Sequence, residues 1–564
     1  MSDPSASPDR PDARPRPARP RLFGLAAGLA TLALMLATEP RLAIVWDEAY
    51  TLGREARVRL WFRAVRDPSA FARSWSPPAL ELVQADRWPA PRADQVGTRA
   101  GLFDPAVLAW FWPFAREEPH GHPPFYALVG LVGDLVAPSW EALPRARLGP
   151  ILAFSLAGGC LAGFFAWRWG AWPALAASGS WALQPQLFGH GHYATYDALL
   201  TCLWVGAILA FELAVGTDPG GTRRDRPRRG WAAVLGVLFG WAAVTKLTGW
   251  FLPLPFLAWA VAYRSRAAWR AAAIAAPVAL TALFAFNPAW WADPIGGVER
   301  FLRSNLTRGR TIPIPIRFLG TTYHTPVESL PWYNTLVWTA MATPVGVLAL
   351  AALGGVRAAR SRRAEPFGTL ALGHWAFLVA LRALPHTPGH DGVRLFLPAF
   401  GVLAILAGLG AASLVERSRR WGRILISVIL IEAGASTALM MPVPLSYYSP
   451  AVGGLPGATA LGMEPTYYWD SLTPEALAFL NDRTSPGRSV GFATFPSSLL
   501  YLRESGRLKA GLAPIDRRPA AWYVLQNRPG AMRAEDRARV DGGGAAFVVS
   551  KLGVPLLWIF PSPP

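Results

Sequence analysis

The stretch Trp46-Asp47-Glu48-Ala49-Tyr50 places two adjacent carboxylates shortly after the first apolar segment of the chain. That segment, residues 22–38, has roughly the minimum length of ~17 residues for a helix that crosses a bilayer. A short apolar step, 42–45, leads to the pair, so both acids are expected near the membrane surface. A carboxylate in such low-dielectric surroundings can act as a base. The alternative is that the two acids only end a membrane helix.

The composition indicates a polytopic membrane protein. Of its 564 residues, 52% are hydrophobic and only 16% are charged, whereas soluble domains have about 25% charged residues. The net charge of +19 could suggest a nucleic-acid partner. We exclude that partner because the arginines form short clusters between apolar segments, as expected of cytoplasmic loops. The two cysteines, Cys160 and Cys202, lie inside apolar segments, so they indicate packing rather than a disulfide or a metal site.

Further apolar segments predict a bundle of about eleven transmembrane helices, counting the first one. They lie at about 148–167, 171–188, 194–215, 231–245, 248–263, 270–287, 333–355, 366–384, 393–415 and 424–441. The run 126–136 is too short to cross a bilayer, so we expect a surface or re-entrant helix there. The predicted fold class is therefore mainly α.

Four arginine clusters predict the orientation of these helices. They are Arg223, Arg224, Arg226, Arg228 and Arg229; Arg264, Arg266 and Arg270; Arg357, Arg360, Arg362 and Arg363; and Arg417, Arg419, Arg420 and Arg423. With the N-terminus inside, all four fall on the cytoplasmic side. We therefore expect a multi-pass protein of the cell (inner) membrane, with residues 1–21 as a disordered basic cytoplasmic tail.

The same alternation places many ionisable residues together on the external side. They are Asp47, Glu48, His122, Arg147, His190, His192, Asp197, Lys246, Asp293, His386, His390, Asp391 and Arg394. Polar residues at helix ends are commonly only interfacial. Ionisable groups at membrane depth, however, usually line a cavity or a pathway. Their shared side predicts an external site.

Three regions follow from this reading. Residues 22–441 form the predicted transmembrane catalytic domain, within which 46–147 is an external loop with short surface helices. Residues 442–564 predict a small external (periplasmic) α/β domain. Its β-like runs lie at 489–494, 521–526, 546–550 and 554–560, and helical patterns separate some of them.

Five motifs follow one another along the external side. They are Asp47-Glu48, His122-Pro123-Pro124-Phe125, Lys246-Leu247-Thr248-Gly249-Trp250-Phe251, Asn287-Pro288 through Asp293-Pro294, and His390-Asp391-Gly392-Val393-Arg394. In this order, over about 20–440, they resemble the protein O-mannosyltransferases and the related aminoarabinose–lipid A transferases. Both families belong to the GT-C class of membrane glycosyltransferases. Phe125 replaces the leucine of the mannosyltransferases' His-Pro-Pro-Leu motif.

The resemblance has one clear departure. Eukaryotic mannosyltransferases carry a large β-trefoil domain in a later external loop, and the external stretch 288–332 is too short for one. The acceptor is therefore left open among a protein, a lipid and a glycan.

The resemblance implies inverting transfer of a hexosyl or pentosyl unit from a polyprenyl-phosphate donor to an acceptor hydroxyl. Asp47 is the expected base, and Glu48 would orient it or bind the acceptor. The candidates for binding the donor phosphate are Lys246, His122, Arg54 and Arg394, and those for binding substrate are Asp197, His390 and Asp391. The histidines leave a divalent metal open, although no ligand spacing favours one. No glycine-rich loop between a strand and a helix indicates a nucleotide cofactor.

Lys246 is singled out by the scarcity of lysine. Only three of the 55 basic residues are lysines, and the other two lie in the C-terminal part, at 509 and 551. A lysine that only reaches toward the head groups could be an arginine, the usual cation of this chain. A compact ammonium beside Gly249 instead suits close contact with a phosphate.

Two other functional classes remain as alternatives. A transporter of a lipid-linked or small polar substrate would also line a cavity with ionisable residues. It should show internal repeats and acids at mid-membrane, and the sequence shows neither. A non-catalytic GT-C-like assembly factor would keep the fold without the base. The presence of Asp47, His122 and Lys246 argues against that class.

Overall fold

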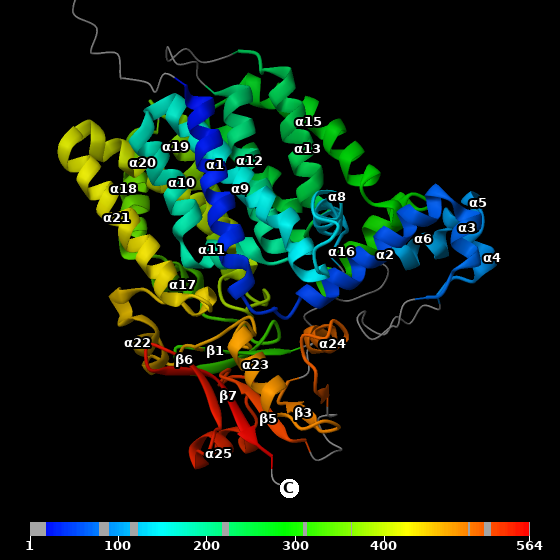
Figure 1. Cartoon of the computed structure of the whole chain (residues 1–564). Helices are drawn as coiled ribbons and strands as arrows, with labels where there is room; N and C mark the ends of the chain where they lie inside the picture. Colours follow the sequence, from blue (N-terminus) through cyan, green and yellow to red (C-terminus); the bar gives the residue numbers. More distant parts are fainter. Residues whose placement is uncertain are drawn as a thin grey trace, which may run out of the picture.

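The computed structural model describes residues 19–77, 90–112, 122–216, 225–307, 313–362, 364–494, 497–512 and 520–562. In this part of the chain, a bundle of long helices stands on a small sheet domain at the C-terminal end (Figure 1). The predicted tail therefore lies outside the described residues as far as residue 18, and so do Arg223, Arg224 and Arg363.

The first helix, α1 (Pro20–Thr38), packs along α9 (Ala142–Trp169) through glycines on both helices. A Cβ atom added to Gly24 would lie 2.8 Å from the carbonyl oxygen of Gly159. Small residues allow two membrane helices to approach this closely, and van der Waals packing then stabilises the pair. The chain continues through η1 (Glu39–Arg41) into α2 (Glu48–Arg66).

The stretch after α1 that was predicted as an external loop forms short helices beside one end of the bundle (Figure 1). They are α3 (Pro68–Arg73), α4 (Ala93–Val96), α5 (Arg99–Leu102), α6 (Pro105–Phe111), α7 (Phe125–Gly130) and α8 (Val132–Val136). The run 126–136 coincides with α7 and α8, which are each far shorter than a membrane crossing.

The other helices of the bundle follow the predicted order. They are α10 (Ala171–Leu183), α11 (Pro185–His192), α12 (Tyr196–Val215), α13 (Arg229–Ala243), α14 (Pro253–Ala262), α15 (Arg266–Ala285), α17 (Asn334–Ala342), α18 (Val345–Arg360), α19 (Pro366–Ala383), α20 (Leu397–Arg417) and α21 (Arg419–Met440). The prediction of a mainly helical polytopic protein is confirmed. The helix α20 lies inside the bundle, since 94% of the most apolar part of residues Arg394–Arg417 is buried.

Six of the described helices are long and apolar enough to cross a membrane, namely Pro20–Arg41, Ala142–Trp169, Tyr196–Val215, Arg266–Ala285, Arg394–Arg417 and Arg419–Met440. Several other predicted spans coincide with shorter or interrupted helices. The span 171–188 is divided before Pro185, and the span 333–355 is divided before Pro344. Proline cannot donate the helical hydrogen bond and disfavours helical geometry in the preceding residue.

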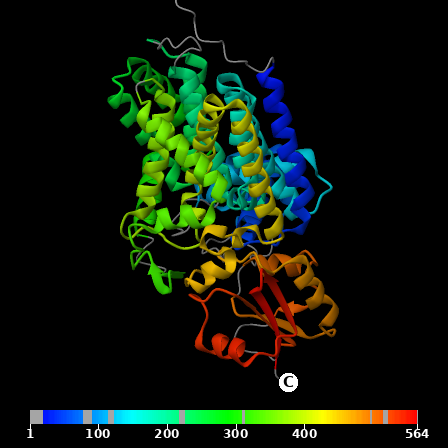
Figure 2. The ribbon, with the colours of Figure 1, turned by 90° about the vertical axis from the view of Figure 1, so that its left-hand side faces the viewer.

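The helices alternate in direction, so their connections gather at two ends (Figures 1 and 2). The start of α1 and the turns α14–α15, α18–α19 and α20–α21 lie at the end remote from the C-terminal domain. The arginine clusters, as far as they are described, therefore share that end. The motifs that were predicted to be external share the opposite end, next to the C-terminal domain.

The C-terminal region contains a five-stranded sheet in the order β4-β3-β5-β7-β6. Its elements are α22 (Gly454–Ala460), α23 (Pro474–Arg483), β3 (Ser489–Phe492), α24 (Ser497–Glu504), β4 (Gly511–Leu512), β5 (Trp522–Gln526), α25 (Ala534–Gly542), β6 (Phe547–Lys551) and β7 (Val554–Pro561). Strand β3 is parallel to β4 and β5, whereas β7 is antiparallel to β5 and β6. The four β-like runs of the sequence correspond to β3, β5, β6 and β7.

A separate hairpin, β1 (Ile314–Phe318) with β2 (Thr321–Thr325), follows α16 (Pro294–Thr307) and reaches the C-terminal region. The Gly320 amide donates to the carbonyl oxygen of Gly462 at 3.0 Å.

The C-terminal region also holds the segment that precedes α2. The Ser498 hydroxyl donates to the carbonyl oxygen of Val45 at 2.6 Å, and the Trp46 amide donates to that of Tyr468 at 3.4 Å. Asp47 is thereby fixed between the bundle and the C-terminal domain.

The orientation can be tested with single cysteines in a Cys160→Ala, Cys202→Ala background. Exposed positions at the two ends suit a membrane-impermeant maleimide: Asp225→Cys and Arg360→Cys at one end, Asp94→Cys and Asp482→Cys at the other. We expect the first two to react only after permeabilisation and the last two to react in spheroplasts. Labelling of Asp225→Cys from outside would contradict the predicted orientation.

Candidate active site

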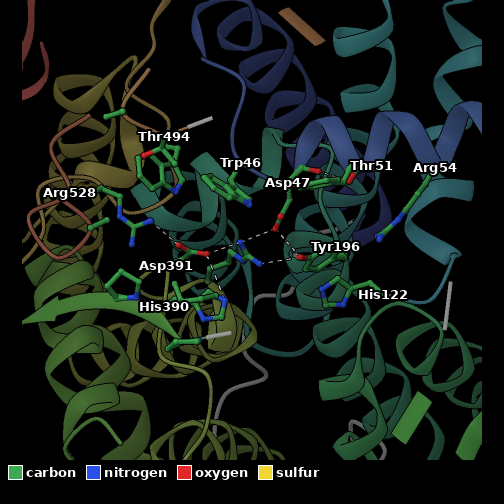
Figure 3. Close-up of a pocket in the computed structure, with 18 of the residues that line it drawn as sticks. Trp46, Asp47, Thr51, Arg54, His122, Tyr196, His390, Asp391, Thr494 and Arg528 are labelled. Carbon is green, nitrogen blue, oxygen red and sulfur yellow. Dashed lines mark hydrogen bonds and ion pairs between the residues drawn. The ribbon is translucent and has the colours of Figure 1, made fainter. Parts of the chain in front are cut away.

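A pocket of about 490 Å³ lies where one end of the bundle meets the C-terminal domain (Figure 3). Trp46, Asp47, Arg54, His122 and Tyr196 line it from the bundle side. His390, Asp391 and Arg394 line it from the segment before α20. Trp469, Thr494, Arg528 and Arg533 line it from the C-terminal region, and Ile314 belongs to β1.

Asp47 lies at the end of the loop before α2, and its carboxylate is held by three groups from distant elements. Its Oδ2 accepts hydrogen bonds from the hydroxyls of Tyr196 at 2.8 Å and Tyr468 at 2.9 Å. Arg394 Nη1 lies 2.8 Å from the same oxygen. The side chain keeps 15% exposure, so this oriented carboxylate still reaches the pocket.

Arg394 connects three carboxylates. Besides Asp47, its guanidinium lies 2.9 Å from Asp391 Oδ2 and 3.1 Å from Asp197 Oδ2. Its Nη2 also donates to the Tyr196 hydroxyl at 3.1 Å. The side chain is only 4% exposed, so neighbouring negative charges are needed to offset the loss of hydration. The planar fork of arginine suits several carboxylates at once.

A second arginine extends this charge network into the C-terminal domain. Arg528 Nη1 donates to Asp391 Oδ1 at 3.4 Å, and its Nε donates to Glu464 Oε2 at 3.0 Å. Glu464 Oε1 also accepts from the amides of Arg317 and Gly530 at 3.2 and 3.1 Å. Burial raises the pKa values of Asp391 and Glu464 above their ordinary values, and the adjacent arginines oppose part of that rise. These arginines therefore favour the charged carboxylates.

Lys246 and Asp197 form a buried pair behind Tyr196. The two polar atoms, Lys246 Nζ and Asp197 Oδ1, lie 2.5 Å apart, and Nζ lies 5.1 Å from the Tyr196 ring centroid. Neither residue is among the described residues that line the pocket. Direct contact of Lys246 with a donor phosphate stays a prediction. In the present arrangement its ammonium neutralises Asp197, which in turn orients Arg394.

Arg54 and His122 lie at the bundle side of the pocket, as Figure 3 shows. Arg54 Nη1 donates to the Tyr126 hydroxyl at 2.6 Å. The imidazole of His122 packs against the Tyr196 ring at a tilt of 38°, with ring centroids 3.7 Å apart. Arg54 thus reaches the pocket from the second turn of α2, and His122 reaches it from the segment just before α7.

Glu48 requires a correction, because its carboxylate does not point toward the pocket. It is fully buried and binds Arg147 through two contacts of 2.7 Å. The amides of Val45 and Ala194 donate to it at 3.1 and 2.9 Å. Consecutive residues at a helix start point about 100° apart, so Asp47 and Glu48 face different surroundings. Glu48 has a structural role in the geometry observed.

The histidines do not form a metal site in the described part of the chain, which contains no suitable group of three or more His, Cys, Asp or Glu residues. His192 bonds through its ring nitrogens to Thr38 Oγ1 at 3.0 Å and to the Phe188 carbonyl at 2.7 Å. His390 lies on the pocket, 4.0 Å from Asp391.

The sequence did not identify several of the residues that form the site. Tyr196 adjoins the predicted Asp197. Its position at the start of α12, at the end of the bundle where the ionisable residues gather, was the available signal. Tyr468, Glu464, Arg528 and Arg533 come from the C-terminal region. No motif there indicated that their side chains meet the membrane helices, because the contact depends on how two domains dock.

Comparison with known proteins supports a GT-C assignment. Residues 122–291, which include His122, Asp197 and Lys246, match the sequence model of the dolichyl-phosphate-mannose-protein mannosyltransferase family. No curated protein gives a significant match.

Among solved structures, ArnT from Cupriavidus metallidurans bound to undecaprenyl phosphate aligns with a TM-score of 0.51 and 13% identity. The alignment covers 95% of this chain and 97% of that chain. The apo state of ArnT gives 0.50 and 14% identity over the same shares. AglB from Archaeoglobus fulgidus gives 0.45 and 10% identity over 90% and 70% of the two chains. The chain has the ArnT-like GT-C fold, and the resemblance indicated by the external motifs is confirmed.

The buried position of Glu48 predicts a stability effect. Glu48→Gln leaves Arg147 with less compensating charge, and breaking a buried pair typically costs about 3–5 kcal/mol. We expect a clearly lower unfolding temperature in detergent. Glu141→Gln, which disrupts the exposed pair with Arg507, is the control and should change little. Equal unfolding temperatures of Glu48→Gln and wild type would contradict the structural role.

Proposed function

We propose that the chain is a membrane glycosyltransferase that moves a hexosyl or pentosyl unit from a polyprenyl-phosphate donor to an acceptor hydroxyl. The observation that carries this proposal is the oriented Asp47 carboxylate in a pocket at the end of the helical bundle, with cationic groups beside it. The ArnT-like fold and the family match support it. The acceptor belongs to a protein, a lipid or a glycan.

The donor enters from the bundle side of the pocket in this proposal. A polyprenyl chain stays in the bilayer, so its phosphate reaches only the level of the helix ends. Arg54, His122 and Arg394 line the pocket there and supply positive charge or hydrogen-bond donors. ArnT, one of the structural neighbours, has been solved with undecaprenyl phosphate bound.

The reaction is an inverting displacement at the anomeric carbon. The acceptor oxygen forms a bond to that carbon while the bond from carbon to phosphate oxygen breaks. Asp47 takes the hydroxyl proton, and the polyprenyl phosphate leaves with the bonding electrons. The cations on the bundle side stabilise the charge that develops on the phosphate. The three groups on Asp47 Oδ2 fix the direction of the carboxylate, which is the geometric requirement for a general base.

The proposed arrangement in the cell follows from the arginine clusters. The N-terminus lies in the cytoplasm, and the pocket and the domain at 442–564 lie on the external side of the inner membrane. Residues 22–441 then form the transmembrane catalytic domain.

The role of Asp47 predicts the effect of Asp47→Asn. This change keeps the shape and removes the base, so we expect turnover to fall roughly 10²–10⁴-fold. The measurement is release of polyprenyl phosphate from a labelled donor in membranes of a deletion strain that carries each variant. Binding of undecaprenyl phosphate should change much less.

Asp293→Asn is the matched control, since Asp293 is an exposed acid at the same end of the bundle. A folded Asp47→Asn protein with near-normal turnover would exclude Asp47 as the base. Among the described residues that line the pocket, Asp391 would then be the remaining acid.

Lys246 gives a second test of the donor side. If its compact ammonium binds the donor phosphate, Lys246→Arg impairs transfer at limiting donor, and Lys246→Met weakens both donor binding and turnover. Titration of undecaprenyl phosphate into purified variants measures the binding part. Wild-type kinetics of Lys246→Arg would restrict the role of Lys246 to its ion pair with Asp197.

A further inference from the structure

Two arginines on the C-terminal side of the pocket take no part in the mechanism above. Arg528 and Arg533 belong to the loop between β5 and α25 and its junction with α25, and both line the pocket. Figure 3 shows Arg528 across the pocket from Arg54. Arg528 therefore lies on the side opposite the proposed donor phosphate, and Arg533 follows it in the same loop of the C-terminal domain.

Arg528 has an unused hydrogen-bond donor. Its side chain is only 3% exposed, and its Nε and Nη1 bind Glu464 and Asp391. Its Nη2 is buried and has no hydrogen-bond partner within the described residues. Leaving a buried charged donor unsatisfied is unfavourable, so a ligand atom that accepts from Nη2 would complete the site.

Arg533 supplies a more accessible guanidinium to the same side. Its side chain is 45% exposed. Its Nη2 donates to the Tyr523 hydroxyl at 3.2 Å, and its Nε lies 3.6 Å from Asp536. Side-chain movement at this exposed position can present the guanidinium fork to an anion, and arginine binds carboxylates and phosphates in this way.

Aromatic surface lies between these arginines and Asp47. Trp46 and Trp469 pack with ring centroids 5.4 Å apart, both are half-buried, and both line the pocket. The guanidinium of Arg528 lies 4.8 Å from the Trp469 ring centroid. Rigid aromatic rings beside a few polar groups are typical of sites that orient a small polar ligand.

We infer that the acceptor carries an anionic group, a phosphate or a carboxylate, which binds Arg528 and Arg533 while a neighbouring hydroxyl of the same molecule reaches Asp47. The inference rests on the proposed function. It places the donor on the bundle side, the acceptor on the C-terminal side, and the reacting hydroxyl between them. The C-terminal domain then selects the acceptor by charge.

The test uses the purified full-length protein in lipid nanodiscs with undecaprenyl phosphate at saturation, so that the donor side is occupied. The probes are glucose 6-phosphate, glucuronate and the neutral match glucose, and binding is followed by ligand-observed NMR. We expect at least one anionic probe to bind about tenfold more tightly than glucose, because one charge-assisted hydrogen bond contributes about that much affinity. Arg533→Gln should lose most of this preference, and so should Arg528→Gln where it folds.

Arg537→Gln is the matched control, because Arg537 is exposed on α25 and is not among the described residues that line the pocket. Its Nη2 donates to the Pro529 carbonyl at 3.1 Å. The variant should keep the anion preference. Preference for one anionic probe alone identifies the group that the acceptor carries.

Two results would overturn the inference. One is equal affinity of wild type for glucose and both anions. The other is an anion preference that survives in Arg533→Gln and is lost in Arg54→Gln, which would assign the anion to the donor side. Failure of wild type to bind undecaprenyl phosphate would instead contradict the proposed function.

Discussion

The site depends on a continuous set of buried charges that alternate in sign. Glu464, Arg528, Asp391, Arg394 and Asp47 follow one another through contacts between 2.8 and 3.4 Å. Asp197 and Lys246 branch from Arg394. Removing these groups from water is costly, so each member needs its neighbours to remain charged. The set has four acids and three bases. One additional proton, which the proposed base catalysis would deliver to Asp47, would make it electrically neutral.

The charge network explains why the C-terminal domain belongs to the site. Arg528 and Glu464 end the network on that domain's side, and Tyr468 donates directly to Asp47. The β1–β2 hairpin joins them because Glu464 accepts the Arg317 amide. A domain that only rested on the bundle would not bury charges shared with the helix ends. Its docking and the geometry of Asp47 therefore form together.

Asp47 and Glu48 are neighbouring carboxylates, yet their side chains have different surroundings and different roles. Arg147 and two backbone amides satisfy the Glu48 carboxylate inside the protein. Asp47 is bound by side chains that themselves line the pocket or adjoin it. The same separation applies to Arg54 and Lys246, of which only Arg54 lines the pocket. Within each pair, the type of side chain alone did not show which residue reaches the pocket.

Hydropathy and arginine spacing alone determined the helical class, the order of the helices and the end at which ionisable residues gather. These are local properties, since bilayer thickness and charge placement act on each segment separately. Together with the resemblance of the five motifs, they made Asp47, His122, Asp391 and Arg394 candidates for one site. Only the tertiary structure decided that Glu48 faces Arg147, that Lys246 pairs with Asp197, and that Tyr468 and Arg528 complete the pocket. Those facts depend on side-chain direction at helix ends and on docking between segments hundreds of residues apart, which no local pattern encodes.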